Sequence, residues 1–172
     1  MSRAGTNRAE WIGRTAEIAV PGALIGVLAG GFAGPLAAMA QQPPMWTVVT
    51  TLALMLPLGV LGGGHGVLLV TGLARPGMFA PVALYWLAGF PLARLVHEVA
   101  TRWVLGGSPG LPEAPLGFLL YQALLGTGFA IGFLWLHERL APHWFLRIAA
   151  RNELARSLLQ QYVQQVERVR QR

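Results

Sequence analysis

The sequence predicts an all-α integral membrane protein, with four transmembrane helices and a cytoplasmic amphipathic helix at the C-terminus. Three observations support this fold class. Of the 172 residues, 54% are hydrophobic and only 12% are charged, whereas charged residues make up about 25% of an average soluble domain. Four apolar runs each exceed the ~20 residues that a helix needs to cross a bilayer. The C-terminal residues are polar except for apolar side chains at a helical spacing.

Turn-forming residues separate the four apolar runs. Pro43-Pro44 follows the first run, Pro76-Gly77 follows the second, and a Gly- and Pro-rich segment at 106–115 follows the third. None of these connections is long enough for a soluble domain. We therefore expect one transmembrane domain over residues 1–140, with spans at about 18–40, 46–73, 78–104 and 116–137.

The positions of the arginines predict the orientation in the membrane. Eleven of the 13 arginines lie before the first run, between the second and third, or after the fourth. An even number of spans places all eleven on one side, and only Arg94 and Arg102 lie on or toward the other. The positive-inside rule then predicts that both termini are cytoplasmic. We interpret the net charge of +6 as this topology signal and an attraction to anionic lipid, not as nucleic-acid binding.

The composition also excludes several kinds of chemistry. The chain has no Cys, Lys or Asp, which excludes thiolate catalysis, Schiff-base chemistry and Asp-based Mg²⁺ sites for phosphoryl transfer. A basic set made only of Arg is typical of GC-rich bacterial genomes. We therefore expect a multi-pass protein of a bacterial plasma (inner) membrane.

Glycines in the first and fourth runs predict close helix packing. A spacing of four residues places such glycines on one side of a helix, where another backbone can approach. The predicted packing residues are Gly22, Gly26, Gly30 and Gly34 in the first run and, as a weaker repeat, Gly128 and Gly132 in the fourth. The partner of the first groove is either another span of this chain or a different protein.

A second glycine-rich stretch, residues 62–66, surrounds His65. One interpretation is a locally unwound segment beside a ligand or ion path. The other, which we favour, is a tight helix crossing in which His65 donates a hydrogen bond to a neighbouring carbonyl group.

The histidines do not match a metal or haem site. His97-Glu98 and His137-Glu138 both lack the second histidine of the H-E-x-x-H zinc motif. His65 and His97 differ by ~16 Å in predicted depth at ~1.5 Å per residue, and His137 and His143 are expected at or beyond the inner boundary. We expect no metal, no cofactor and no enzymatic activity.

The strongest candidate for a polar site lies in the third run. Arg94, Glu98 and Arg102 are spaced i,i+4, so they share one helix face and can pair in a ladder. We favour a structural ladder that fixes this helix. The alternative is a polar path for a proton, an ion or a substrate anion, because ionisable residues within a membrane are often functional. The candidate polar site comprises Arg94, His97, Glu98, Arg102 and His65.

Residues 141–172 form the predicted cytoplasmic helix, with one apolar stripe along about 25 residues. The stripe fits either the inner leaflet or a helix of another protein, and we favour a protein partner. The residues expected to contact the partner or lipid are Arg147, Arg151, Arg156, Leu159, Tyr162 and Val166.

These observations favour a small non-catalytic accessory or structural subunit of a larger membrane complex. Its expected partners are the lipid bilayer and other membrane subunits or further copies of the same chain, with no nucleic acid. The alternative hypothesis is a small transporter or channel component that uses Arg94, His97 and Glu98 along a polar path.

Overall fold

The computed structural model describes the backbone of residues 3–170 and the side chains of residues 8–165 and Glu167. All secondary structure in this range is helical. The elements are α1 (Arg3–Gly31), α2 (Ala33–Met39), α3 (Pro44–Val70), α4 (Phe79–Gly106), α5 (Pro115–Ile148) and α6 (Glu153–Arg170). Four segments are long and apolar enough to cross a membrane. They are Arg8–Met39, which contains most of α1 and all of α2, and the helices α3, α4 and α5. The prediction of an all-α protein with four candidate spans is therefore confirmed.

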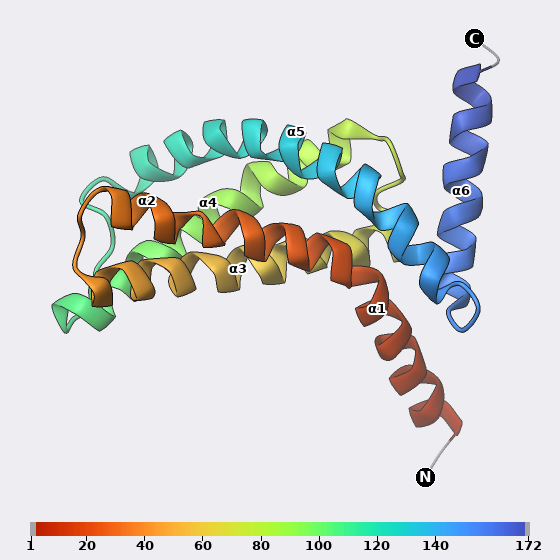
Figure 1. The fold of residues 1–172 in the computed structure, drawn as a ribbon, viewed down its shortest axis with the longest axis horizontal. Coiled ribbons are helices and arrows are strands. Elements are labelled where there is room, and N and C mark those ends of the chain that lie inside the picture. The colour runs from red at the N-terminus through yellow and green to blue at the C-terminus, as the bar shows by residue number, and fades with distance from the viewer. Residues whose placement is uncertain (1–2, 171–172) are drawn as a thin grey trace.

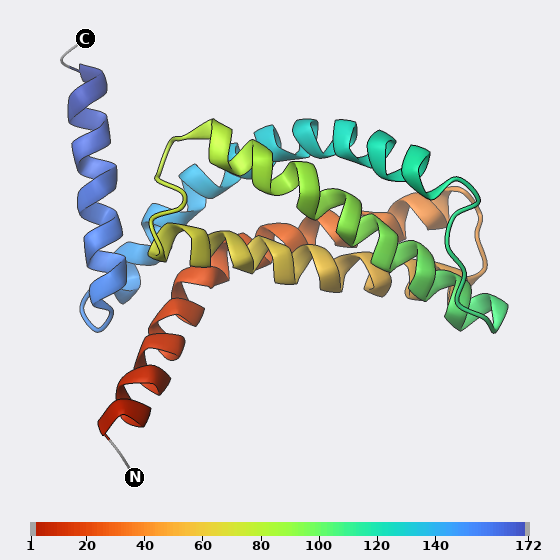
Figure 2. The same cartoon turned by 180° about the vertical axis from the view of Figure 1, so that it is seen from behind.

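The four long segments lie side by side and run alternately in opposite directions (Figures 1 and 2). We call one end of this bundle the α6 end, where α6 and the α3–α4 connection lie. The other end, with the α2–α3 and α4–α5 connections, is the loop end. In both views α6 runs across the end of the bundle instead of along it, and the first turns of α1 lean away from the bundle.

The predicted glycine groove of α1 is occupied by α3 of the same chain. Gly22 and Gly62 face each other so closely that a Cβ on either residue would strike the carbonyl group of the other. A Cβ on Gly26 would strike the carbonyl group of Leu58, and Gly30 lies against the backbone of Met55. Gly34, in α2, lies against the hydroxyl group of Thr51. This crossing leaves no room on that face of α1 for another protein.

Gly128 and Gly132 do not pack against another helix within the described part of this chain, and packing of these glycines against another protein stays a prediction. A Cβ added at either residue would meet nothing within 4 Å among the described residues. The packed glycine of α5 is Gly126, which lies against the backbone of Trp86 in α4. The inner face of α5 passes through Gly126, Ala130 and Phe133, and at 3.6 residues per turn this places Gly128 and Gly132 on the outer face.

The C-terminal region also differs from the expectation. Helix α5 continues through Pro142 to Ile148, so the expected boundary after residue 140 falls inside a helix. A proline removes one helical hydrogen bond, but this turn of α5 buries Ala141, Phe145 and Ile148, which offsets that loss. The prediction of a single C-terminal helix of about 25 residues is therefore wrong, because the chain turns at residues 149–152 before α6 begins.

Two buried apolar clusters hold the fold together. The first lies within the bundle and contains Ile25, Leu58, Val82, Trp86, Ala93, Ala130 and Phe133. The second lies at the α6 end and contains Ile18, Leu69, Ala74, Ala141, Phe145, Ile148, Ala155 and Leu158. Because Ala155 and Leu158 belong to α6, the second cluster attaches α6 to the bundle.

Candidate functional site

Four of the predicted site residues lie together on α4, in a group that we call the Arg94 cluster: Arg94, His97, Glu98 and Arg102, with Thr50 from α3. Because α3 and α4 lie side by side, Thr50 reaches the imidazole of His97, and the Oγ1–Nε2 distance is 2.6 Å. Both side chains are buried. Thr50 was not among the predicted site residues, because threonine in an apolar run carries no distinctive signal.

The hydrogen bonds of His97 define its tautomer. Arg94 Nη1 donates to His97 Nδ1 over 2.9 Å. A guanidinium group only donates hydrogen bonds, so Nδ1 is the acceptor and Nε2 carries the proton. His97 therefore donates from Nε2 to the hydroxyl oxygen of Thr50. This chain of bonds ties the cationic head of Arg94 to the helix interface.

Only half of the expected ladder forms. Glu98 accepts a hydrogen bond from Arg102 Nε at 2.8 Å, as the i,i+4 spacing predicts. Arg94 bonds to His97 instead of forming the other rung with Glu98. The reason is that His97 is buried against Thr50 and offers Arg94 a nearer acceptor on the same face.

The Arg94 cluster borders a pocket of about 370 Å³ near the loop end. Its lining includes Trp46 of α3 and Thr101 of α4 together with the four site residues of α4. Thr101 is buried, and its hydroxyl group has no hydrogen-bond partner within the described structure. Two arginines and one glutamate give the lining a net positive charge, which suits a small anion.

His65 does not belong to this cluster. It lies 15 residues after Thr50 in α3, or roughly 22 Å along the helix at ~1.5 Å per residue. Helix α3 is continuous through residues 62–66, so the stretch is a tight crossing and not an unwound segment. The expected hydrogen bond to a carbonyl group is absent, because neither ring nitrogen of His65 has a partner among the described residues.

His65 instead packs against His137 of α5, with ring centroids 4.6 Å apart and the rings nearly perpendicular. Phe133 contacts both rings. His137 is 0% exposed, so it lies in the interior of the protein, and its depth relative to the inner boundary stays a prediction. Helix α5 continues for three turns beyond the predicted end of the fourth span at residue 137.

The histidine pair, His65 and His137, is an incomplete ligand set. None of its four ring nitrogens has a hydrogen-bond partner in the part of the chain that the structure describes. Within the same residues no group of three or more His, Cys, Asp or Glu side chains could hold a metal ion.

A packed apolar layer separates the histidine pair from the Arg94 cluster. Trp86, Phe133 and Leu58 are each at most 2% exposed, and all three belong to the buried cluster of the bundle. The bundle interior between the two groups is therefore apolar at these three positions.

The residues predicted to contact a partner at the C-terminus divide into two sets. Arg147, Arg151 and Arg156 are exposed. Leu159 and Tyr162 are partly buried against the apolar cluster at the α6 end, so this part of the stripe packs on the chain itself. The side chain of Val166 lies outside the described residues.

Helix α6 is also held by polar contacts with the bundle. The side chain of Asn152 donates to the Arg14 carbonyl (2.9 Å) and to the Glu17 carboxylate (3.0 Å). Arg151 forms an ion pair with the same carboxylate at 3.0 Å. Farther along α6, the hydroxyl group of Tyr162 donates to Glu138 at 3.3 Å. Burial, followed by the nearby Glu138 carboxylate, raises the pKa of Tyr162.

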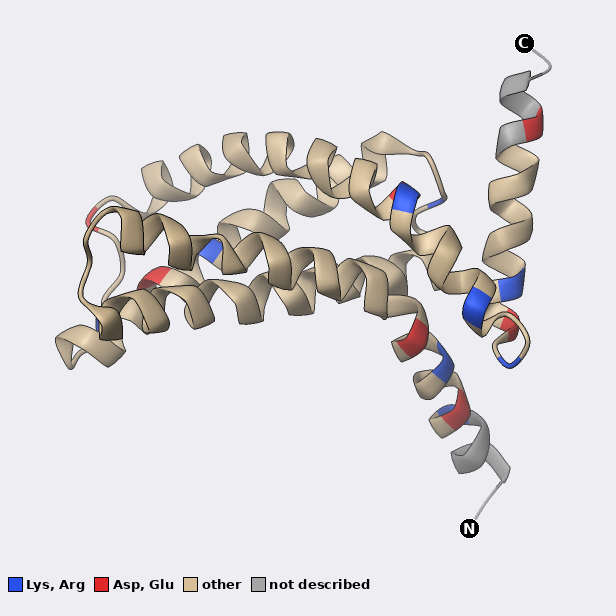
Figure 3. Cartoon of the chain, viewed as in Figure 1, with Lys and Arg blue, Asp and Glu red and all other residues tan. Residues whose placement is uncertain are grey.

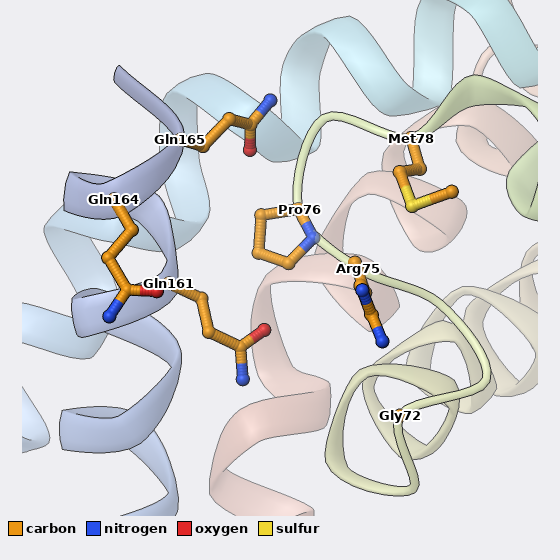
Figure 4. Close-up of a pocket in the computed structure, with 7 residues that line it drawn as sticks. All are labelled: Gly72, Arg75, Pro76, Met78, Gln161, Gln164 and Gln165. Carbon is orange, nitrogen blue, oxygen red and sulfur yellow. The ribbon is translucent and has the colours of Figure 1, made fainter. Parts of the chain in front are cut away.

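A polar pocket of about 520 Å³ lies between α6 and the α3–α4 connection (Figure 4). Gln161, Gln164 and Gln165 line it from α6, and Arg75 and Pro76 line it from the connection. The side chains of Gln161, Gln164 and Arg75 are exposed. The pocket is therefore an open seam between two surface segments.

By the length and composition of its four long segments, the chain has the fold of a helical multi-pass membrane protein. No protein-family model, curated protein or solved structure matches it.

Proposed function

We propose that this protein is a non-catalytic subunit of a larger membrane complex, with four spans in the bilayer and both termini at the cytoplasmic face. The observation that carries the proposal is the α1 arm, residues 3–14, whose first turns lean away from the bundle (Figures 1 and 2). Every residue from 8 to 13 is exposed. Two of them are large and apolar: Trp11 is 46% exposed and Ile12 is 56% exposed.

The arm continues α1, so its helix needs no separate nucleus, but residues 8–13 are exposed and gain nothing from packing on the bundle. A projecting helix with an exposed tryptophan and isoleucine therefore favours a further contact. The arm also carries Arg8, Glu10 and Arg14, which suit a polar interface better than the hydrocarbon core. The glycine groove is filled by α3, so the proposed contact uses the arm and not the groove.

The charge distribution supports the proposed orientation. Figure 3 shows charged residues on the α1 arm and around the α6 end, with few along the four-helix body. The arginines with described side chains at the α6 end are Arg8, Arg14, Arg75, Arg139, Arg147, Arg151 and Arg156. Of the arginines with described side chains, only Arg94 and Arg102 lie toward the loop end. An excess of arginine on one side is typical of the cytoplasmic side.

The proposal is tested by purifying the tagged protein from its native membrane in a mild detergent. We expect partner proteins at constant stoichiometry, and we expect Trp11→Ser/Ile12→Ser to lose them while retaining its thermal unfolding midpoint. Trp103→Ser is the matched control, because Trp103 is 62% exposed at the loop end. Recovery of the wild-type chain only as a monomer or a homo-oligomer would contradict the proposal.

The Arg94 cluster favours a second candidate function, a small transporter or channel component. Its support is the net positive pocket of about 370 Å³ beside the buried His97–Thr50 hydrogen bond. Reconstituted vesicles would then conduct protons or small anions, and Glu98→Gln would abolish the flux. Glu113→Gln, at an exposed loop residue, is the control. Equal flux in both variants would remove this candidate. The packed layer between the two polar groups favours the first proposal.

A further inference from the structure

A groove of about 240 Å³ lies between α1 and α5, near the α6 end of the bundle. Val20, Leu24 and Leu140 form its apolar part. His143, Trp144 and Arg147 line its other part. We propose that this groove binds an anionic phospholipid. Part of one acyl chain would lie along the apolar residues, and the phosphate group would bind Arg147.

The lining residues follow the order of groups in a phospholipid: the cationic side chain lies toward the end of the bundle, as the headgroup does, and the apolar side chains lie deeper, as the acyl chains do. Arg147 lies in the last turn of α5, whereas Leu140 lies seven residues deeper, or about 10 Å at ~1.5 Å per residue. Leu24 lies deeper than Val20 along α1 in the same sense. All lining residues belong to the candidate spans Arg8–Met39 and Pro115–Ile148. The apolar part therefore lies at acyl-chain depth, and Arg147 lies where headgroups begin.

Trp144 forms an apolar wall of the groove because its polar atom is already used. Its indole N–H donates to the carbonyl oxygen of Glu17 at 2.8 Å. This bond joins α5 to α1 at the α6 end of the groove. Toward the loop end, Leu24 and Leu140 are 55% and 47% exposed, so the apolar part is open along the bundle surface, where lipid chains would lie.

Arg147 provides the charge that an anionic headgroup requires. Among the described residues it forms no ion pair, whereas Arg14, Arg102 and Arg151 each have a carboxylate partner. A free guanidinium group can bind two phosphate oxygens at once. His143 Nδ1 donates to the Arg139 carbonyl at 2.8 Å, which leaves Nε2 as its second polar atom beside the groove. No carboxylate lines the groove to repel a phosphate.

The test is native mass spectrometry of the full-length protein in detergent, titrated with phosphatidylglycerol or phosphatidylcholine. We expect one phosphatidylglycerol to bind more tightly than phosphatidylcholine. Arg147→Gln should weaken that binding about tenfold, because a charged hydrogen-bonded contact is lost. Arg156→Gln, which removes the same charge from an exposed position on α6, should bind as the wild type does.

Two further arms separate the lipid from its headgroup. Leu24→Trp should weaken phosphatidylglycerol binding by covering the apolar part, and the half-exposed position of Leu24 should let this variant fold. Glycerophosphoglycerol, which carries the headgroup without acyl chains, should not compete with the lipid. Equal binding of phosphatidylglycerol to the wild type and Arg147→Gln would overturn the proposal. So would full competition by the chain-free headgroup, or unchanged binding to a folded Leu24→Trp variant.

Discussion

The indole N–H of Trp144 in α5 donates to the backbone carbonyl of Glu17 in α1 at 2.8 Å. This carbonyl is available because residue 21, four positions later in α1, is a proline. Proline has no N–H, so the helical hydrogen bond to Glu17 is missing. Trp144 supplies the missing donor and at the same time joins the two helices. One absent bond within α1 thus becomes a link between α1 and α5.

We predict that Trp144→Phe destabilises the protein by about 1 kcal/mol, the net contribution of a typical hydrogen bond. In a Pro21→Ala background the same substitution should cost less, because residue 21 could then donate to Glu17 itself. The measurement is equilibrium unfolding in detergent, read as a double-mutant cycle. Trp135→Phe, at a residue that is 54% exposed, is the control. Equal costs of Trp144→Phe in both backgrounds would contradict the link.

We predict that Gly62→Ala destabilises the bundle by about 1–3 kcal/mol, the range for inserting a group into a packed interior. Its Cβ would strike the carbonyl group of Gly22, so α1 and α3 must move apart. Gly128→Ala should be neutral or slightly stabilising, because nothing lies within 4 Å of its Cβ and alanine favours the helix. Thermal unfolding of both variants provides the measurement. A larger cost at Gly128 than at Gly62 would refute the assigned packing faces.

We predict that Asn152→Ala loosens α6 without unfolding the four-helix bundle. Asn152 is 0% exposed, and its Oδ1 accepts from the backbone N–H groups of Leu154 and Ala155 at 3.0 and 3.2 Å. Loss of such an N-cap costs about 0.5–2 kcal/mol. Loss of the bonds to Arg14 and Glu17 adds to this cost. Relative to the wild type, we expect amide hydrogen exchange to become faster in residues 153–165 of the variant, whereas exchange in α3 should not change.

The matched control for that experiment is Gln160→Ala at an exposed position of α6, which should leave the exchange rates unchanged. Asn152→Asp separates the two roles of the side chain. It retains an oxygen for the cap, but it removes the donor to Arg14 and places a carboxylate beside Glu17. We expect exchange between that of the wild type and Asn152→Ala. Equally slow exchange in all variants would show that α6 is held by its apolar contacts alone.

We predict that Thr50→Val destabilises the protein by about 1–2 kcal/mol, because it leaves the buried Nε2 proton of His97 without an acceptor. The two side chains have nearly the same shape, so packing should be preserved. Thr127→Val is the control, since the Thr127 hydroxyl has only a long 3.4 Å bond to a carbonyl within its own helix. Thermal unfolding at neutral pH tests this, and no difference between the variants would argue against the His97–Thr50 bond.

The sequence correctly predicted those features that depend on local pattern. Long apolar runs gave the four candidate spans, and the i,i+4 spacing gave the Glu98–Arg102 pair. The four-residue spacing identified the packing face of α1. Each follows from helix geometry within one segment, so no knowledge of the neighbouring helices is needed.

The contacts between segments were not predictable in the same way. The Arg94–His97–Thr50 chain depends on the register of α3 against α4, and the histidine pair depends on the register of α3 against α5. Pro142 illustrates a related problem, because proline within an apolar run is compatible with either a helix end or a continued helix. Helix α5 continues past Pro142 because this places Phe145 and Ile148 in the buried interior.

The sequence by itself therefore determined that this chain forms long apolar helices, where α3, α4 and α5 begin to within two residues, and which side of α1 can approach another helix. The tertiary structure decided that α3 fills the groove of α1, that His137 meets His65, and that Trp144 bonds to the carbonyl group freed by Pro21. The physical reason is the range of the interactions. Hydrogen bonding and periodicity within a helix act over three or four residues, whereas packing depends on how separate helices align.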